Sequence, residues 1–352
     1  MNRIIISPVI WSLLLQATLS GCQEKVQASQ NLVETQTTEK EHLAKINGVC
    51  FVAPAKAITT TEMGCVDSVS ANWVCLMPYA FTPKNEAKVL WNHKWQWWGE
   101  KREGFIETIK LAQQLNKKIM VKPHLWIGHG EFTGNLKFDT EQKWSSWERD
   151  YAKYVLDCAH IADSLKAEIF CFGTELKTPI NERTAFWLEL IDSIRVRFSG
   201  KITYAANWDN FEQIPFWNKL DFIGVDAYFP LTSKINPSKE ELAESWKPWS
   251  QKLQNLSKKH DRKILFTEFG YRSIQNNLEA PYEYAKSAEY HLEAQSVALN
   301  ALFTHTWNQD WMAGGFLWKW YANHQKQHFA NNDYSPQNKP AQQIIRQYYS
   351  TH

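Results

Sequence analysis

The chain has 352 residues, of which 44% are hydrophobic, 22% charged and 14% aromatic. This length is enough to bury a large core, and it predicts one barrel domain or two smaller domains. The formal net charge is +2, which argues against nucleic acid or an acidic polymer as the ligand.

The N-terminal region predicts export. Residues 1–21 hold a short basic start, Arg3, and an apolar run that is short for a spanning helix, as in a secretory signal peptide. The stretch Leu19-Ser20-Gly21-Cys22 resembles the lipobox of bacterial lipoproteins, in which the cysteine carries the acyl chains. A chance cysteine after an ordinary signal is the alternative, and the four-residue match in the right place favours the lipobox.

The segment after the leader predicts a tether. Residues 22–45 are rich in Gln, Glu, Thr, Ser and Lys, a composition typical of disordered linkers. Gln23, where an aspartate would otherwise stand after the lipidated cysteine, indicates by analogy the outer membrane of a Gram-negative cell. We therefore expect an exported protein that contacts the membrane of the bacterial cell envelope through a lipid anchor only.

Five cysteines follow the lipobox, at positions 50, 65, 75, 158 and 171. An odd number in an exported chain leaves at least one thiol free. Cys75, Cys158 and Cys171 lie within strand-like or helix-like apolar patterns, so we interpret them as small core residues. A disulfide that involves Cys65 is compatible with the sequence, and the absence of any C-x-x-C pair argues against a structural zinc site.

Residues 46–352 alternate between strand-like and helix-like stretches. The strand-like runs are apolar without alternation, which is typical of parallel strands covered on both faces: Asn47–Ala53, Ala71–Pro78, Lys118–His124, Glu168–Thr174, Lys201–Ala206, Asp221–Tyr228, Lys263–Glu268 and Gly314–Trp320. Helical periodicity marks Glu103–Leu115, Glu148–Leu165, Phe186–Phe198, Glu240–Leu256, Tyr282–Leu302 and Pro340–Tyr349. Eight such units predict a single α/β domain, a closed (β/α)8 TIM barrel. An open doubly wound sheet is disfavoured because no glycine-rich loop follows the first strand.

In such a barrel, functional groups gather at the C-terminal ends of the strands. Two of these ends repeat one design: an apolar run is followed by Gly-Thr-Glu at Glu175 and by Thr-Glu at Glu268. Burial of an unpaired carboxylate on a strand costs folding free energy, so its presence there needs a reason. Two facing carboxyl groups are the catalytic groups of a glycosidase. The alternative is that each glutamate caps a helix or forms a salt bridge, and the repetition of the motif favours catalysis.

Polar and aromatic residues at the other strand ends predict a carbohydrate cleft. We expect sugar contacts from Tyr79, His124, Trp126, Asn207, Trp208, Tyr228, Trp318 and Trp320. Each has a plainer alternative, namely packing for the aromatic residues, a satisfied structural group for the histidine and a loop cap for the asparagine. Asp209 and Asp226 are rival carboxylates; because Asp226 lies two residues before Tyr228, we expect it to point inward.

Other chemistries have weaker signals. The sequence contains no G-x-S-x-G, no G-x-x-x-x-G-K-[ST] and no H-E-x-x-H. Its histidines are too scattered for a convincing metal site. We therefore expect no metal and no cofactor.

The glutamate stretches resemble a known family. Phe172-Gly173-Thr174-Glu175-Leu176, together with the stretch from Phe266 to Ser273, is similar to glycoside hydrolase family 113, the clan A β-1,4-mannanases. Residues 315–321 and 333–341 also look like the last strand and loop of that family. The likeness covers roughly residues 46 to 350.

The resemblance implies a retaining, endo-acting barrel enzyme with Glu175 as acid/base and Glu268 as nucleophile. Its substrate would be β-1,4-mannan, glucomannan or galactomannan. Many clan A enzymes carry asparagine directly before the acid/base, where this chain has Thr174, so the sugar remains open. Two alternatives stand beside a monomeric endo-mannanase: a clan A glycosidase for another β-glycan, and a surface lipoprotein that binds glycans without cleaving them.

Overall fold

The structure is a computed structural model that describes residues 45–283, 289–322 and 332–351. The predicted signal peptide, Cys22 and nearly all of the predicted tether fall within residues 1–44, outside the described residues. Within the described ranges, every helix is too short or too polar to cross a membrane.

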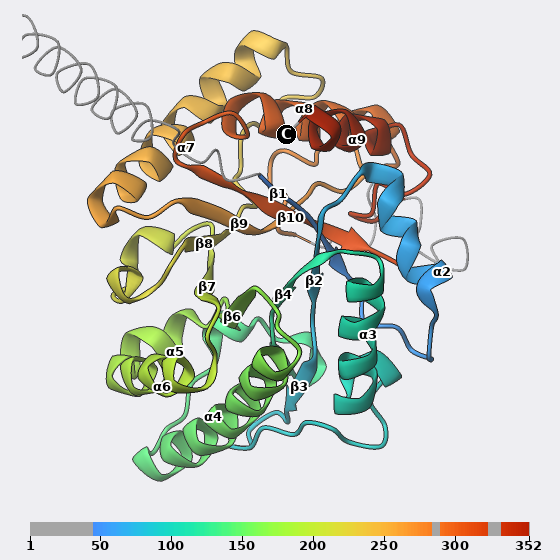
Figure 1. Cartoon of the computed structure of the whole chain (residues 1–352). Coiled ribbons are helices and arrows are strands. Elements are labelled where there is room, and N and C mark those ends of the chain that lie inside the picture. The colour runs from blue at the N-terminus through green and yellow to red at the C-terminus, as the bar shows by residue number, and fades with distance from the viewer. Residues whose placement is uncertain (1–44, 284–288, 323–331, 352) are drawn as a thin grey trace, which may run out of the picture. The chain divides into compact units, whose positions relative to one another are not determined.

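Eight parallel strands close into a barrel in the order β1-β2-β4-β6-β7-β8-β9-β10 (Figure 1). Their bounds are Ile46–Phe51 (β1), Trp73–Leu76 (β2), Lys118–Val121 (β4), Ile169–Thr174 (β6), Lys201–Asn207 (β7), Ile223–Asp226 (β8), Ile264–Phe269 (β9) and Met312–Trp320 (β10). Each of these strands overlaps one of the eight strand-like runs predicted from the sequence. The predicted (β/α)8 TIM barrel is confirmed.

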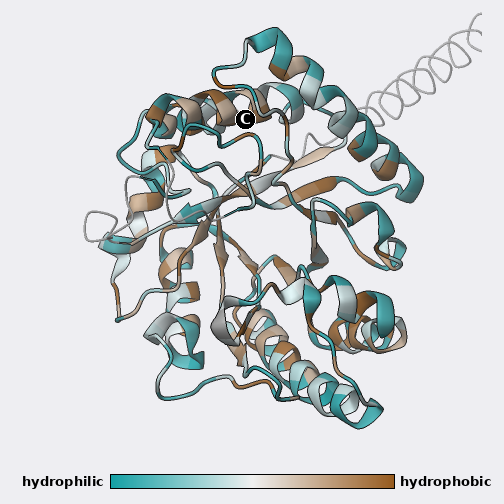
Figure 2. Cartoon of the chain, turned by 180° about the vertical axis from the view of Figure 1, so that it is seen from behind, coloured by the Kyte–Doolittle hydropathy of each residue, from teal (hydrophilic) through white to brown (hydrophobic). Residues whose placement is uncertain are grey.

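Helices surround the barrel strands (Figure 1). They are Thr60–Met63 (α2), Arg102–Gln114 (α3), Glu141–Ser164 (α4), Lys177–Glu182 (α5), Thr184–Arg197 (α6), Lys239–His260 (α7), Leu292–Thr306 (α8) and Ala341–Thr351 (α9). Short 3₁₀ turns span Gly64–Val69, Trp98–Glu100, Gly128–Gly130, Thr133–Asn135, Phe211–Gln213 and Trp217–Lys219. Hydrophobic and hydrophilic residues interchange along the surrounding helices (Figure 2), as expected where one face covers the barrel.

Two helix starts differ from the prediction by more than two residues. α4 begins seven residues early, at Glu141 instead of Glu148, because the Thr140 side chain caps it by accepting from the Lys143 N–H at 3.3 Å. α8 begins at Leu292 and not at Tyr282, because His291 caps it and residue 290 is still in a β-bridge with Ile274.

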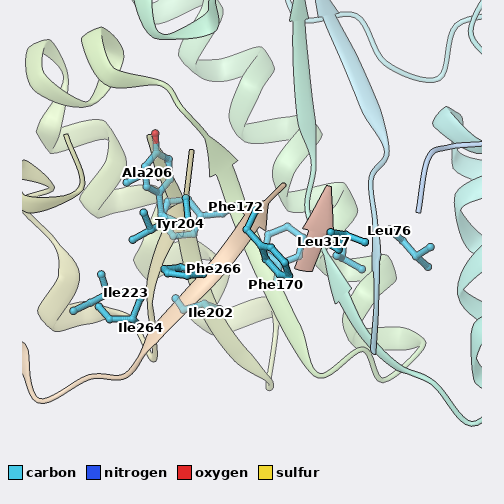
Figure 3. Close-up of a cluster of buried hydrophobic side chains, with 14 of the residues drawn as sticks. Leu76, Phe170, Phe172, Ile202, Tyr204, Ala206, Ile223, Ile264, Phe266 and Leu317 are labelled. Atoms are coloured by element: carbon cyan, nitrogen blue, oxygen red, sulfur yellow. The ribbon is translucent and has the colours of Figure 1, made fainter. Parts of the chain in front are cut away.

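Buried side chains form two layers. Phe172 of β6 packs against Trp187 of α6, and it belongs with Phe170, Tyr204 and Phe266 to the outer layer between strands and helices (Figure 3). Alternate strand residues form a separate cluster inside the barrel: Ile46, Cys50, Cys75, Met120, Ile169, Cys171, Ala205, Leu265 and Phe316. The burial predicted for Cys75, Cys158 and Cys171 is confirmed, while Cys65 is a free, half-buried thiol.

A second, two-stranded parallel sheet extends the barrel at one side. It pairs β3, Tyr79–Thr82, with β5, His124–Ile127. β3 follows β2 and β5 follows β4, and in both cases a proline, Pro78 or Pro123, stands directly before the new strand. Proline has no N–H for the ladder, so each barrel strand ends there and the chain continues in a new pair.

Candidate active site

A charged cluster occupies the barrel interior beyond the apolar layer. Lys122 is 0% exposed, and its Nζ donates to an Oε of Glu268 and lies 3.8 Å from Oδ1 of Asp226. It also donates to the Thr267 carbonyl at 3.3 Å. A buried ammonium is expensive unless it is paired, and here the two carboxylates pair it. They hold the pKa of Lys122 well above its ordinary value, although burial acts in the opposite direction.

Thr267 and Glu268 are consecutive residues of β9, and both contact this cluster. A register irregularity between β8 and β9 explains how they do so. Val225 pairs with Phe266, but Asp226 pairs with Glu268, so one residue of β9 is skipped. The Thr267 hydroxyl donates to Asp226 Oδ1 at 2.7 Å, while Glu268 contacts Lys122. A bulge of this kind re-aims a side chain and is common next to active sites.

Both oxygens of the Glu268 carboxylate have donors. Lys122 Nζ serves Oε1, and the Tyr228 hydroxyl donates to Oε2 at 2.7 Å. The Glu268 side chain is 8% exposed, and Tyr228 is 6% exposed. The carboxylate is therefore held in position with a positive charge beside it, and little of the Glu268 side chain is exposed.

Asp226 points inward, as its spacing from Tyr228 predicts. It is fully buried, and its Oδ2 has no hydrogen-bond partner among the described residues. Burial and the charge of Glu268 raise the pKa of Asp226 to about 7, against the opposing effects of Lys122 and Thr267. At neutral pH this carboxyl group is therefore partly protonated and does not stand as a second full negative charge beside Glu268.

Glu175 stands at the turn from β6 into α5. Its φ is 54°, in the left-handed region that a non-glycine residue occupies at a cost of about 1–3 kcal/mol. Its N–H donates to the Ala205 carbonyl at 2.9 Å, and its carbonyl accepts from the Lys177 N–H at 3.0 Å. The fold thus holds the backbone in a strained conformation at this carboxylate.

The carboxyl group of Glu175 interacts electrostatically with the charged cluster. Burial raises its pKa well above the ordinary value, and the charges of Asp226 and Glu268 raise it further, while Lys122 opposes them. The two predicted glutamates are thus brought to one site, but in different surroundings. Glu268 has a cationic donor, and Glu175 has desolvation and neighbouring negative charge.

His124 borders the same site. Its Nε2 lies 3.7 Å from Oε1 of Glu268 and has no hydrogen-bond partner in the described part of the chain. Burial, assisted by the charge of Lys122, lowers the pKa of His124 well below its ordinary value. The imidazole is therefore neutral, and it stacks on the Trp318 ring at 5.8 Å with an interplanar angle of 8°.

The remaining predicted contacts divide by exposure. Tyr79 is half-buried with its ring 5.0 Å from His124, and Trp126 is 54% exposed. At the end of β7, Oδ1 of Asn207 accepts from the backbone N–H of Trp208 at 2.9 Å. The Trp208 ring stacks on Tyr282 at 5.1 Å.

One of the predicted rim residues lies elsewhere. Trp320 is 1% exposed, belongs to the outer core and donates to Cys65 Sγ at 3.1 Å, which corrects its placement in the cleft. It lies two residues beyond Trp318, but the pairing of β10 with β1 shifts register between Leu317 and Trp320, so the simple alternation of faces fails there. Asp209 pairs with Lys177 at 2.9 Å, and its negative charge is the weakest of those that raise the pKa of Glu175.

Lys122 is the functional residue that the sequence analysis missed. It lies two positions after Met120, an interior residue of β4, so strict alternation would have placed a lysine inside the barrel. An inward cation in an apolar run requires a buried anion. In the part of the chain that the structure describes, no three His, Cys, Asp or Glu side chains gather as metal ligands.

Comparison with known proteins places this arrangement among carbohydrate-active barrels. Residues 53–339 match the sequence profile of Glycoside Hydrolase Family 113. No curated protein sequence matches the chain. The structure is similar to that of the GH113 β-mannanase AaManA from Alicyclobacillus acidocaldarius in complex with ManMIm, with a TM-score of 0.78, 22% identity, and coverage of 88% of this chain and 98% of that one.

Two further solved structures show the same fold. A GH113 β-1,4-mannanase complex has a TM-score of 0.75 at 21% identity, covering 88% of this chain and 99% of that chain. A β-glucuronidase from Ruminococcus gnavus, in complex with C6-substituted uronic isofagomine, has a TM-score of 0.60 at 12% identity and covers 87% and 50% respectively.

Proposed function

The chain belongs to glycoside hydrolase family 113, and on that premise we propose that it is a retaining endo-β-1,4-mannanase acting on mannan or glucomannan. The observation that carries the proposal is the contrast between two carboxyl groups at one barrel mouth. Glu175 has a raised pKa, as a general acid requires, and Glu268 is held between Lys122 and Tyr228, as a fixed nucleophile requires.

In the first step, an Oε of Glu268 attacks the anomeric carbon. A bond forms between that carbon and the carboxylate oxygen, while the bond to the glycosidic oxygen breaks. The proton of Glu175 passes to the departing oxygen, so the leaving chain departs as a neutral alcohol. Lys122 and Tyr228 keep the attacking carboxylate oriented until the bond has formed.

In the second step, water replaces the leaving chain. Glu175 is now a carboxylate and takes a proton from the water as its oxygen bonds to the anomeric carbon. The bond to Glu268 breaks, and its negative charge returns beside Lys122. Two inversions at one carbon give net retention of configuration.

Unsatisfied polar groups at the site are candidate sugar contacts. The Thr174 hydroxyl oxygen is buried without a partner among the described residues, as is His124 Nε2. Unpaired buried polar atoms are costly, and sugar hydroxyls would satisfy both. The assignment to mannan draws on the family and on two structurally similar proteins, both of them β-mannanases.

The cellular setting is part of the proposal. A lipid on Cys22 would attach the enzyme to the bacterial cell envelope, and a tether over residues 22–45 would link this anchor to the barrel. We expect the enzyme to act as a monomer without metal or cofactor. Labelling with radioactive palmitate tests the anchor: the full-length protein should incorporate label, and Cys22→Ser should not. Label in that variant would contradict a lipid on Cys22.

A substrate panel tests the activity. Full-length protein in mild detergent is incubated with mannan, glucomannan, galactomannan, β-glucan and xylan, and product sizes are measured over time. We expect a ladder of mannose-containing oligosaccharides, absent with Glu268→Gln. Cleavage of β-glucan or xylan alone would support another β-glycan as substrate, while binding without products in the wild type would support a non-catalytic glycan receptor.

A further inference from the structure

The small β3–β5 sheet presents one face made of aromatic rings. Tyr79 pairs with His124, and Phe81 pairs with Trp126. Paired residues of parallel strands project to the same side, and so do residues two apart on one strand. The four rings therefore stand on one face in two rows, separated by two residues, or about 6.6 Å along the strands.

The inner row joins the catalytic centre. The Tyr79 ring lies 5.0 Å from His124, and His124 stacks on Trp318. His124 Nε2 is 3.7 Å from the Glu268 carboxylate. A ligand on the inner row is thus beside the proposed nucleophile.

The outer row is open to solvent. Trp126 is 54% exposed, and Trp95, at 53%, stands edge-on to Phe81 with ring centres 5.5 Å apart. His93 lies 5.3 Å from Trp95 and continues the run. The opposite face of the sheet is different, because Thr82 accepts there from the buried Trp147 of α4 at 3.2 Å.

A cluster of exposed aromatic rings that continues a binding cleft marks a contact surface. These rings are flat and uncharged, which suits the C–H faces of pyranose rings better than a charged peptide or a phosphate. We propose that Phe81, Trp95 and Trp126, here called the aromatic shelf, bind the polysaccharide chain at least one sugar unit away from the cleaved bond. This inference rests on the proposed function and makes the enzyme selective for long chains.

Substitution of the shelf tests the proposal with substrates of different length. Trp126→Ala and Trp95→Ala should each lower kcat/KM on soluble glucomannan about tenfold, the loss of one aromatic contact. Hydrolysis of an aryl β-mannobioside, which is too short to reach the outer row, should be unchanged. Trp97→Ala is the matched control, since Trp97 is 52% exposed but has no ring contact with the shelf among the described residues.

The outcomes separate the shelf from the activity itself. Equal losses on short and long substrates, or the same loss for Trp97→Ala, would overturn the shelf. If the wild type cleaves nothing, the proposed function fails. Affinity electrophoresis in gels containing glucomannan then still tests the aromatic shelf. Retardation of the wild type but not of Trp126→Ala would support binding by the shelf, and identical mobility would overturn it. A change of sedimentation coefficient in Trp126→Ala would identify a second copy of the chain as the occupant and would also overturn it.

Discussion

Two adjacent layers of one barrel interior have opposite chemistry. Around Met120 and Cys171 the interior is apolar, filled by the inner cluster of side chains. One layer further toward the C-terminal ends of the strands, three charged residues, Lys122, Asp226 and Glu268, take their place and are also buried.

The apolar layer contributes mainly to stability, and the charged layer contributes mainly to chemistry. The apolar layer is stabilised by removal of surface from water, at about 25 cal/mol per Å². The charged layer gains little net stability from a buried ion pair. The charged layer instead orients the carboxylate of Glu268. Substitutions in the apolar layer should therefore change mainly stability, and substitutions in the charged layer should also change activity.

The largest effect should come from Glu268→Gln. The amide keeps the shape and the Tyr228 contact but cannot attack the anomeric carbon, so kcat should fall by at least about 10⁴-fold. Initial rates on glucomannan measure it, and thermal unfolding checks the fold. Retention of more than a tenth of the wild-type rate would show that Glu268 is not the nucleophile.

Glu175→Gln should lower kcat on polysaccharide by about 10²–10⁴-fold. In the wild type, kcat/KM should fall as pH rises through the raised pKa of Glu175, because the acid loses its proton. The alkaline fall should vanish in the variant. An aryl glycoside whose leaving group needs no proton is the control: its first step should be nearly unaffected, and a full loss there would argue against the acid role.

Lys122→Met should separate orientation from packing. It leaves two buried carboxylates unpaired, and we expect a loss of about 3–5 kcal/mol in the free energy of unfolding. The loss should be larger at pH 8 than at pH 5. Burial and Glu268 raise the pKa of Asp226 in the folded protein and Lys122 opposes them, so removal of the lysine raises that pKa further. The folded variant then binds more protons than the folded wild type, and it loses more stability as pH rises.

Chemical denaturation at the two pH values measures this effect. Lys118→Met, at the exposed start of the same strand, is the matched control and should change stability little. Equal stability of the Lys122 and Lys118 variants would contradict the charged layer as described.

Tyr228→Phe removes one donor to Glu268, a charged hydrogen bond worth about 1.5–3 kcal/mol. The expected loss in kcat is about ten- to a hundredfold, with a small change in melting temperature. Tyr271→Phe is the control, because the Tyr271 hydroxyl is buried without a hydrogen-bond partner in the described ranges. Comparable losses in the two variants would exclude a specific role for the Tyr228 hydroxyl.

The smallest effect belongs to Met120→Leu in the apolar layer. A swap of similar volume should cost less than about 1.5 kcal/mol in unfolding free energy. Although Met120 lies two positions before Lys122, kcat should be unchanged. A tenfold loss of kcat without loss of stability would show that the two layers are not separable.

Much of this contrast is visible in the sequence. Eight apolar runs with interleaved helices predict the barrel, and the repeated Thr-Glu ends predict both carboxylates, because burial of an acid at a strand tip needs a reason. The inward direction of Asp226 follows from its spacing of two from Tyr228.

The remainder depends on local departures from regularity. The skipped residue at Thr267 and the left-handed turn at Glu175 carry no composition signal. They arise from how neighbouring strands pair. Strict alternation misplaces Trp320 because it fails at the irregular end of β10. The β3–β5 sheet is not predicted because the predicted runs stop at Pro78 and His124, where β3 and β5 begin.

Covalent trapping tests the central claim most directly. The full-length protein is incubated with a 2-deoxy-2-fluoro mannosyl fluoride, digested, and analysed by mass spectrometry. The account predicts one fluoromannosyl adduct, on the peptide that contains Glu268 and at that carboxylate. An adduct on Asp226 instead would contradict the assignment of nucleophile and, with it, the role given to Lys122 and Tyr228.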